Sequence, residues 1–243
     1  MPPPSTTRTG LARAMSKLGF CSRSRATELI RMGKVSVNRA VRKNPEFPVI
    51  MGRDIIVMDD VSINQAAQVY VMLNKPAGLV TTTSDEHGRD TVYACFEGTK
   101  FPHLPPVGRL DKASEGLLLF SNDNVWSDFI TNPETHLDKT YHVQIEGLVD
   151  AAFLTRLRLG VKDSGDHLSA KKVKILRTGE KNTWLEFTLD EGRNRHIRRL
   201  LAAFEIEVLR LIRVAIGDLN LGQLPKGKWR ELSRGEVKAL RPQ

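Results

Sequence analysis

The chain has 243 residues, of which 40% are hydrophobic and 27% are charged, a balance typical of a globular protein with one large or two smaller domains. Lysine and arginine number 37 against 28 aspartates and glutamates, and the net charge of +9 predicts a polyanionic partner, with nucleic acid ahead of an anionic membrane. No apolar run is long enough to cross a bilayer, which excludes a membrane-spanning helix. The histidines and the two cysteines, Cys21 and Cys95, have no metal-ligand spacing, so we expect free thiols in a reducing cytoplasm and no metal.

The first expected domain, residues 8–65, lies in the most basic part of the chain, since positions 1–67 hold 11 lysines and arginines against 5 acidic residues. Apolar residues at near-helical spacing predict a short helix over residues 10–18. A second helix is expected over residues 22–31, for which Ser22 is a typical N-cap. Alternating β-branched residues then predict two strands, over residues 35–38 and within residues 53–58.

This succession of helices and strands resembles a small RNA-binding domain first recognised in a ribosomal small-subunit protein and also called the alpha-L motif. The resemblance is carried by the segments Cys21–Ala26 and Leu29–Asn38. In that family, the face formed by the two helices binds structured RNA through its shape and its phosphates. A basic helical face that is simply solvated is the alternative. The resemblance implies RNA contacts by Arg23, Arg25, Arg31 and Lys34.

The second expected domain, residues 68–243, follows a polar segment over residues 59–68 that we expect to act as a short linker. It begins with a strongly apolar strand at Val69–Leu73, and β-branched residues predict another strand at Leu79–Thr83. A helix is expected over residues 122–132. Further strands are expected over residues 139–147, 184–189 and 208–217.

The stretch Val107–Phe120 combines a polar loop with a buried strand. Its apolar end predicts the strand, and Gly108 and Gly116 bracket the loop, which carries Arg109 and Asp111. A carboxylate on a loop that is supported by a buried strand has a fixed direction and is well placed for chemistry. A residue that caps a helix or closes a turn is the alternative interpretation of Asp111.

The motif Gly-Arg-Leu-Asp-x-x-Ser-x-Gly-Leu-Leu at residues 108–118 resembles the signature of the RNA pseudouridine synthases, in particular the RsuA family. Other segments match that family in the same order, and the matches span residues 11 to 232. They include Lys75-Pro76, the Lys-x-Tyr motif at 139–141 and the Gly-Arg-x-x-x-Ile-Arg-Arg motif at 192–199. The resemblance implies isomerisation of uridine to pseudouridine in ribosomal RNA. Residues 114–116 and 191–195 look more like members that modify large-subunit RNA.

The resemblance also assigns roles to single residues. Asp111 acts at the ribose as nucleophile or as base, and Tyr141, which is otherwise a core aromatic, lies against the target base. Arg198 contacts Asp111, and a nearby guanidinium favours the charged form of a carboxylate. Helical spacing independently places Arg198 half-buried on the flank of an apolar stripe, whereas Arg195 and Arg199 point more nearly away from it. A solvated basic helix is the alternative, and it would explain Arg195 and Arg199 but not the flank position of Arg198. The remaining expected RNA contacts are Lys75, Arg109 and Arg195.

The implied reaction oxidises nothing and transfers no group to a second substrate, so we expect no cofactor. The implied fold is α+β, with the small helical domain followed by a mixed, mostly antiparallel sheet whose central cleft is lined by the Asp111 loop. We expect a monomer whose partner is a structured stem-loop of ribosomal RNA. Two alternatives are a non-catalytic RNA-binding or ribosome-assembly protein and a glycosidase-like hydrolase, for which Glu115 is the nearby second carboxylate.

Overall fold

The computed structural model describes residues 7–64, 66–82 and 88–241, and the chain divides into two compact units. The first unit contains the chain up to Val69 and two short segments from farther along, Gly98–Pro105 and Ser121–Asn124. Asn122 holds the end of the first stretch, because its side-chain Oδ1 accepts a hydrogen bond from the backbone N–H of Val69 (2.8 Å). The second unit contains the rest of the described chain.

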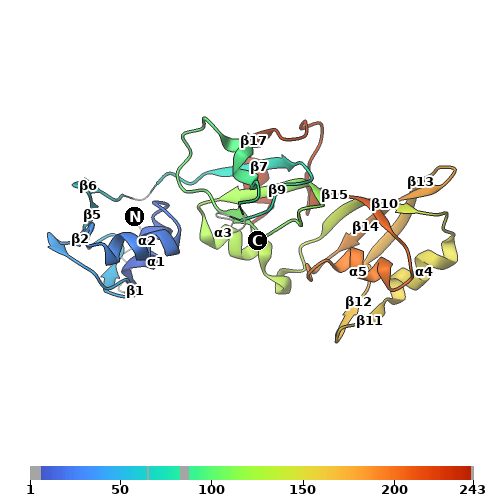
Figure 1. Cartoon of the computed structure of the whole chain (residues 1–243), viewed down its shortest axis with the longest axis horizontal. Helices are drawn as coiled ribbons and strands as arrows, with labels where there is room; N and C mark the ends of the chain where they lie inside the picture. The colour runs from blue at the N-terminus through green and yellow to red at the C-terminus, as the bar shows by residue number, and fades with distance from the viewer. Residues whose placement is uncertain (1–6, 65, 83–87, 242–243) are drawn as a thin grey trace. The chain divides into compact units, whose positions relative to one another are not determined.

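Two helices and a small sheet form the first unit (Figure 1). The helices are α1 (Leu11–Lys17) and α2 (Arg23–Arg31), as predicted, and the Ser22 side chain accepts a hydrogen bond from the backbone N–H of Arg25 (3.2 Å). Gly33, with a φ of +74°, follows the end of α2. Among the described residues, the sheet has the strand order β3-β2-β5-β6 and a separate pair joins β1 to β4. These strands are β1 (Arg8–Gly10), β2 (Val35–Val37), β3 (Ala40–Val41), β4 (Pro48–Ile50), β5 (Ile56–Met58) and β6 (Val61–Ser62).

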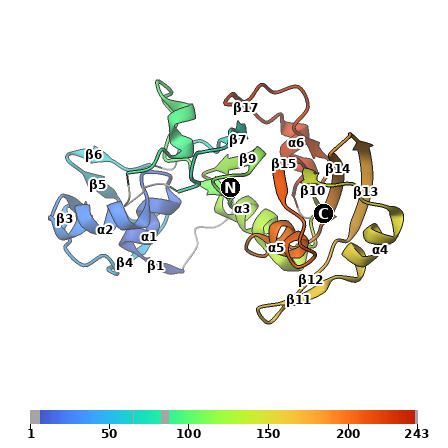
Figure 2. The ribbon, with the colours of Figure 1, turned by 45° about the vertical axis from the view of Figure 1, so that its right-hand side comes forward.

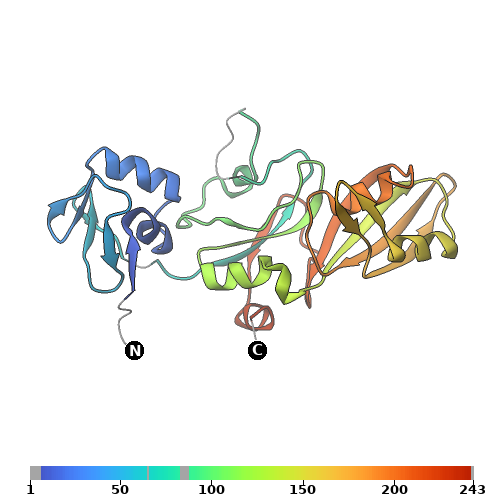
Figure 3. The same ribbon diagram turned by 90° about the horizontal axis from the view of Figure 1, so that it is seen from below.

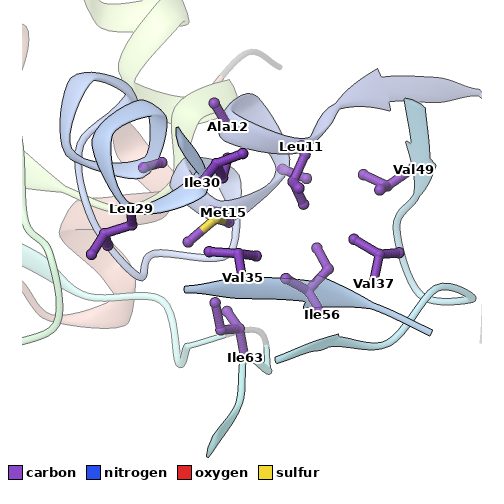
Figure 4. Packing of buried hydrophobic residues seen from close by; sticks show 12 residues of the cluster. Leu11, Ala12, Met15, Leu29, Ile30, Val35, Val37, Val49, Ile56 and Ile63 are labelled. Carbon is purple, nitrogen blue, oxygen red and sulfur yellow. The ribbon is translucent and has the colours of Figure 1, made fainter. Parts of the chain in front are cut away.

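One apolar core holds this unit together (Figure 4). Met15 of α1 and Ile30 of α2 are fully buried, and they face Val35 and Ile56 from the sheet. Ile63 joins the same core, which corrects one expectation. The segment 59–68 is not simply a linker, because it contains strand β6, and Ile63, the residue after that strand, is buried in the core.

A mixed sheet dominates the second unit, and within the described residues it has nine strands. Its main path runs in the order β13-β14-β10-β15-β9-β7-β17, with β16 beside β15 and β8 beside β9. The pairings of β13 with β14, β14 with β10, β10 with β15, β15 with β16, β8 with β9 and β7 with β17 are antiparallel, whereas β9 pairs with β15 in parallel. The strands are β7 (Tyr70–Lys75), β8 (Pro106–Val107), β9 (Glu115–Ser121), β10 (Lys139–Glu146), β13 (Lys172–Thr178), β14 (Asn182–Leu189), β15 (Val208–Ile216), β16 (Leu219–Asn220) and β17 (Trp229–Glu231).

Helices pack against this sheet in two places. Near β10 and β14, one apolar core includes α4 (Ala151–Leu159) and α5 (His196–Ala202), which lie on the same side of these strands (Figure 3). Near β7 and β9, a second core includes α3 (Asn124–Thr131) and α6 (Arg234–Ala239). Figure 2 shows β15, β10, β14 and β13 side by side. The remaining elements are the hairpin β11 (Val161–Asp163) and β12 (Asp166–Leu168) and the 3-10 helices η1 (Val92–Phe96) and η2 (Pro133–Thr135).

The predicted α+β architecture is confirmed, and the strands expected at 139–147, 184–189 and 208–217 correspond to β10, β14 and β15. The prediction of a strand at Leu79–Thr83 is wrong for the part of this segment that the structure describes. There the chain makes a single parallel bridge between Val80 and Thr91, and Thr83 lies outside the described residues. Among the described residues, no helix is long and apolar enough to cross a membrane.

Candidate active site

A cavity of about 350 Å³ opens in the second unit, a size typical of a small-molecule or single-nucleotide site. Its walls come from the loop before β9, from the start of β10, from the residues around the start of α5 and from the inward face of β15. Elements far apart in the sequence therefore build the site. The sequence-predicted residues that line it are Arg109, Asp111, Tyr141, Arg195 and Arg198.

The loop that carries Asp111 is fixed by two glycines. Gly108 and Gly116 have φ values of +76° and +100°, a region that favours glycine over other residues. A Cβ at Gly116 would lie 2.3 Å from the backbone oxygen of Arg213, so no larger residue fits between β9 and β15. Within the loop, the backbone N–H of Ser114 donates to the carbonyl oxygen of Asp111 (2.9 Å). The carboxylate therefore leaves a rigid turn that runs directly into a buried strand.

Lys75 lies under this loop, and its predicted contact with RNA phosphates is wrong. Its side chain is completely buried, so RNA in solution cannot reach it. The Nζ atom donates to the carbonyl oxygens of Ser114 (2.8 Å), Pro76 (3.0 Å) and Asp111 (3.2 Å). Burial lowers the pKa of Lys75 to about 8. The ammonium ties the end of β7 to the backbone of the Asp111 loop.

The segment after β7 supports the same loop from a second direction. The hydroxyl of Thr81 donates to the carbonyl oxygen of Leu110 (2.8 Å), and the backbone N–H of Gly78 donates to that of Lys112 (2.8 Å). Leu110 is 7% exposed and lines the cavity. The role of Thr81 was missed, because its β-branched side chain was interpreted as part of a strand over Leu79–Thr83.

Arg198 is half-buried, as its helical position predicted, and it lines the cavity with Asp111. Its guanidinium donates to the carbonyl oxygens of Ala113 (Nη2, 3.3 Å) and Val208 (Nη1, 3.3 Å). No ion pair joins Arg198 to Asp111 in the part of the chain that the structure describes. Burial and the neighbouring Arg195 lower the pKa of Arg198, and the charge of Asp111 acts in the opposite direction. Arg198 therefore contacts the backbone of the Asp111 loop. It acts on the carboxylate of Asp111 through its charge, without a hydrogen bond to it.

Tyr141 stands on β10 directly opposite Arg213 on β15, and the two residues line the cavity. The ring of Tyr141 is partly buried and also packs against the apolar core under the sheet. Both interpretations of Tyr141 from the sequence therefore fit its position, because the residue belongs to the core and also lines the site. A base that entered the cavity would meet an aromatic side chain there.

Two basic residues expected to contact RNA, Arg109 and Arg195, are exposed and lie at the cavity. Arg195 has a φ of +50° and is the N-cap residue of α5. The structure does not place the other expected RNA contacts at the cavity. They lie in the first unit on and after α2, and all are exposed: Arg23, Arg25, Arg31 and Lys34.

Arg199 points away from the apolar stripe of α5, but it is not simply solvated, as the alternative of a solvated basic helix would require. Its guanidinium pairs with Asp163 and with Asp166 (2.9 Å), and Arg193 also pairs with Asp166 (2.8 Å). These contacts hold the β11–β12 hairpin against the start of α5. The spacing of α5 correctly placed Arg199 off the apolar stripe, but it could not show that an acidic hairpin covers that side.

Glu115, the second carboxylate that a hydrolase would need beside Asp111, forms ion pairs with other residues. It makes a bidentate pair with Arg210 (2.8 and 3.0 Å) and pairs with Lys226 (2.5 Å). The hydrogen bonds from Arg210 are the main cause that lowers the pKa of Glu115 to about 2. Among the described residues that line the cavity, Asp111 carries the one carboxylate. The site therefore has no carboxylate pair of the kind used in glycoside hydrolysis.

Two cationic residues of the cavity, Lys139 and Arg213, were missed by the sequence analysis. Arg213 is 6% exposed, and Lys139 is half-buried two positions before Tyr141 on the same face of β10. A signal was present in the sequence, because Leu211, Arg213 and Ala215 alternate on the inward face of a strand. An arginine among apolar inward positions requires a specific partner. Among the described residues, no cluster of His, Cys, Asp and Glu could hold a metal ion.

One carboxylate surrounded by cationic side chains, beside an aromatic ring and on a mixed sheet, defines a site for a polyanionic substrate with a planar group. Comparisons with known proteins agree with that class. Residues 69–203 match the RNA pseudouridylate synthase family, and residues 9–55 match the S4 domain. The chain belongs to the RNA pseudouridine synthases, as an RsuA-like member with an N-terminal S4 RNA-binding domain, and it is therefore an isomerase.

Individual relatives cover nearly the whole chain. An RNA pseudouridine synthase of Aquifex aeolicus (strain VF5), described as uncharacterized, is 37% identical over 227 residues, which are 93% of this chain and 91% of its own. The ribosomal large subunit pseudouridine synthase B of Bacillus subtilis (strain 168) is 34% identical over 233 residues, 95% of each chain. A crystal structure of a pseudouridylate synthase is 30% identical, with a TM-score of 0.67, and covers 96% of this chain and 100% of its own.

Proposed function

We propose that this enzyme converts one uridine of ribosomal RNA to pseudouridine, and that the uridine lies in the large-subunit RNA. The observation that supports this target is the likeness, over 95% of both chains, to a Bacillus subtilis protein named as a large-subunit enzyme. The exposed basic residues of the S4 unit provide a surface for structured RNA. An enzyme with such a substrate would work in the cytoplasm, where ribosomes are assembled, and we infer that it works as a monomer.

We propose Asp111 as the group that acts at the ribose. In the reaction, the C1′–N1 bond of uridine breaks and a C1′–C5 bond forms, so one group must act on the sugar while the base turns. Asp111 is the one carboxylate among the described residues of the cavity, and its backbone is held on both sides. It serves as the nucleophile at C1′ or as the base that removes a sugar proton, and both roles require the ionised form.

The other proposed residues act on the base and on the loop. A uridine in a stem must leave its stack before it can reach a cavity of this kind. Tyr141 then packs against the extruded base, and Leu110, which lines the same cavity, helps to exclude water. Arg198 would keep the Asp111 loop in place through its bond to the carbonyl oxygen of Ala113. In this proposal Arg198 positions the carboxylate without bonding it.

RNA binding is divided between the two units in this proposal. Residues 8–65 form the anchoring domain and residues 68–243 the catalytic domain. The anchor would contact phosphates through the exposed side chains of α2 and the residues after it, whereas Arg109 and Arg195 would contact the RNA at the cavity. Such contacts are electrostatic, so binding should weaken steeply as salt is added.

The decisive experiment maps the product. The purified protein is incubated with unmodified ribosomal RNA of both subunits from its own source, and pseudouridine is located by carbodiimide labelling and primer extension. We expect one new pseudouridine in the large-subunit RNA. Asp111→Asn should give none while still binding the RNA. A new pseudouridine in small-subunit RNA would reject the proposed target, and full activity of Asp111→Asn would reject the proposed role of the carboxylate.

A further inference from the structure

A buried guanidinium nitrogen in the cavity has no partner. Arg213 is 6% exposed and lines the cavity from β15. Its Nε donates to the carbonyl oxygen of Leu117 (2.8 Å), but its buried Nη2 has no hydrogen-bond partner among the described residues. Nearly all buried donors in proteins are paired, and an unpaired charged donor is especially unfavourable. Because the side chain of Arg213 lines an open cavity, a substrate that fills the cavity can supply the missing acceptor.

A second cation stands close to the first. Lys139 is half-buried on the inward face of β10, two positions before Tyr141, and lines the same cavity. Lys139 and Arg213 lie on the neighbouring strands β10 and β15 and line one cavity. Burial lowers the pKa of Lys139, and the charge of Arg213 lowers it further. The carboxylates of Asp138 and Asp190 offset this effect only in part. Two like charges held together at a cavity wall favour a ligand that carries or develops negative charge.

The base of uridine develops that charge during the reaction. When the C1′–N1 bond breaks, its electron pair stays with the base and gives a uracil anion, whose charge is spread over N1 and the two carbonyl oxygens. C5 of the turned base then forms the new bond to C1′, the proton on C5 is lost, and N1 takes up a proton. The base leaves as an anion whether Asp111 attacks C1′ or removes a sugar proton. Electron count and composition are unchanged overall.

We propose that Arg213 and Lys139 bind the carbonyl oxygens of the uracil and stabilise the negative charge that forms when the base separates from the ribose. The pair would therefore act as a charge-stabilising site for the leaving group, a role that is worth most in a water-poor cavity. Tyr141 stands opposite Arg213, so a base that stacks on this ring lies beside both cations. The inference rests on the proposed use of this cavity as the active site and is independent of which RNA carries the uridine.

The test compares leaving groups of different intrinsic stability. Arg213→Gln and Lys139→Gln are measured in single turnover, at saturating RNA, on an RNA that the natural protein modifies. One RNA carries uridine at the target and the other carries 5-fluorouridine, whose fluorine withdraws electrons and stabilises the detached anion. The rate of consumption of the target nucleoside is followed by nuclease digestion and chromatography. RNA affinity and thermal unfolding are measured beside it.

For uridine, we expect Arg213→Gln to slow turnover by about 100-fold or more and Lys139→Gln by about tenfold, values typical of lost charge stabilisation. RNA affinity should change by less than about threefold, because these groups act after the base has bound. With 5-fluorouridine the reduction in turnover rate should be smaller by about tenfold, because the fluorinated anion is intrinsically more stable and gains less from the two cations. Arg158→Gln, a change of an exposed arginine on α4 outside the cavity, should leave both rates unchanged.

Two results would overturn the proposal. Turnover within about threefold of the natural protein, in variants that fold normally, would show that the cations do not act in the chemical step. An equal loss with uridine and 5-fluorouridine, accompanied by weaker RNA binding, would assign the pair to a phosphate of the RNA. If Arg213→Gln fails to fold because its bond to Leu117 is lost, Lys139→Gln carries the test alone. If the proposed RNA target is wrong, the natural protein itself will not modify that RNA. If this inference is wrong, the natural protein is still active and only the rates of the variants differ from those expected.

Discussion

The buried ammonium of Lys75 donates a hydrogen bond to the backbone carbonyl of Asp111 across 3.2 Å, so the cation lies beneath the proposed reaction centre. It also bonds the carbonyl of Ser114 (2.8 Å), and it therefore spans the turn that carries the carboxylate. A lysine before a proline in an exposed turn would serve RNA phosphates equally well on sequence grounds. Burial decides between these roles, because a side chain that is out of reach of solvent cannot contact a phosphate.

Replacement of this lysine tests the assignment. Lys75→Met should lower the free energy of unfolding by about 1–3 kcal/mol, because buried carbonyl oxygens of the loop lose their donor. Turnover should fall more than tenfold, since a displaced carboxylate loses its alignment. The slope of RNA affinity against salt should stay unchanged, because no phosphate contact is removed. Lys112→Met, an exposed change in the same loop, provides the control in urea unfolding and in binding titrations.

The close approach of Gly116 to β15 gives a second prediction. In Gly116→Ala the new Cβ would lie 2.3 Å from the backbone oxygen of Arg213, at a φ of +100°, and we expect a loss of more than about 3 kcal/mol or failure to fold. Gly227→Ala is the matched control, with a φ of +76° and nothing within 4 Å, and it should cost only about 1 kcal/mol. Urea unfolding followed by circular dichroism measures both. Equal stability of the two variants would show that β9 and β15 can separate.

The exposed cations around α2 give a prediction about RNA binding. Arg31→Gln and Lys34→Gln should each weaken binding to the modified RNA and reduce the slope of affinity against salt by about one unit. Turnover at saturating RNA should be unchanged, because these residues belong to the unit that does not contain the cavity. Filter-binding titrations at several salt concentrations measure the slope. Arg158→Gln on α4 is the control, and an equal effect there would indicate only a general loss of charge.

Local patterns predicted much of this fold. The N-cap at Ser22, the apolar stripe of α5 and the alternation of β10 are short-range features, and each corresponds to an element in the structure. The Asp111 loop was predicted from two glycines and an apolar run, which are also adjacent in sequence. The segment 59–68 was misjudged because its strand is polar and depends on pairing with β5.

Features that depend on distant partners escaped prediction. The hydrogen-bond partner of Lys75 lies in a loop more than 30 residues later. The ion-pair partners of Arg199 are aspartates of a hairpin more than 30 residues earlier. Helical spacing correctly gave the half-burial of Arg198, but it could not supply the carbonyl oxygens that the guanidinium meets. Arg213 was visible as a charge on an inward face, yet only the sheet order brings it opposite Tyr141. Pairing across the sheet therefore decides the chemistry of the cavity.

Glu115 gives a prediction about acid stability. Its side chain is 7% exposed, and its pairs with Arg210 and Lys226 lower its pKa to about 2 from an ordinary 4.5. Since the folded-state pKa is depressed, the stabilisation is complete above pH 4.5 and is lost as the pH falls toward 2. Glu115→Gln should therefore unfold more easily than the natural protein at pH 7, by at most about 3 kcal/mol, with the gap closing in acid. Urea unfolding between pH 7 and pH 3 measures this gap, and the exposed Glu146→Gln should show none. A gap that is constant with pH would mean that packing of Glu115, and not its charge, joins the start of β9 to β15.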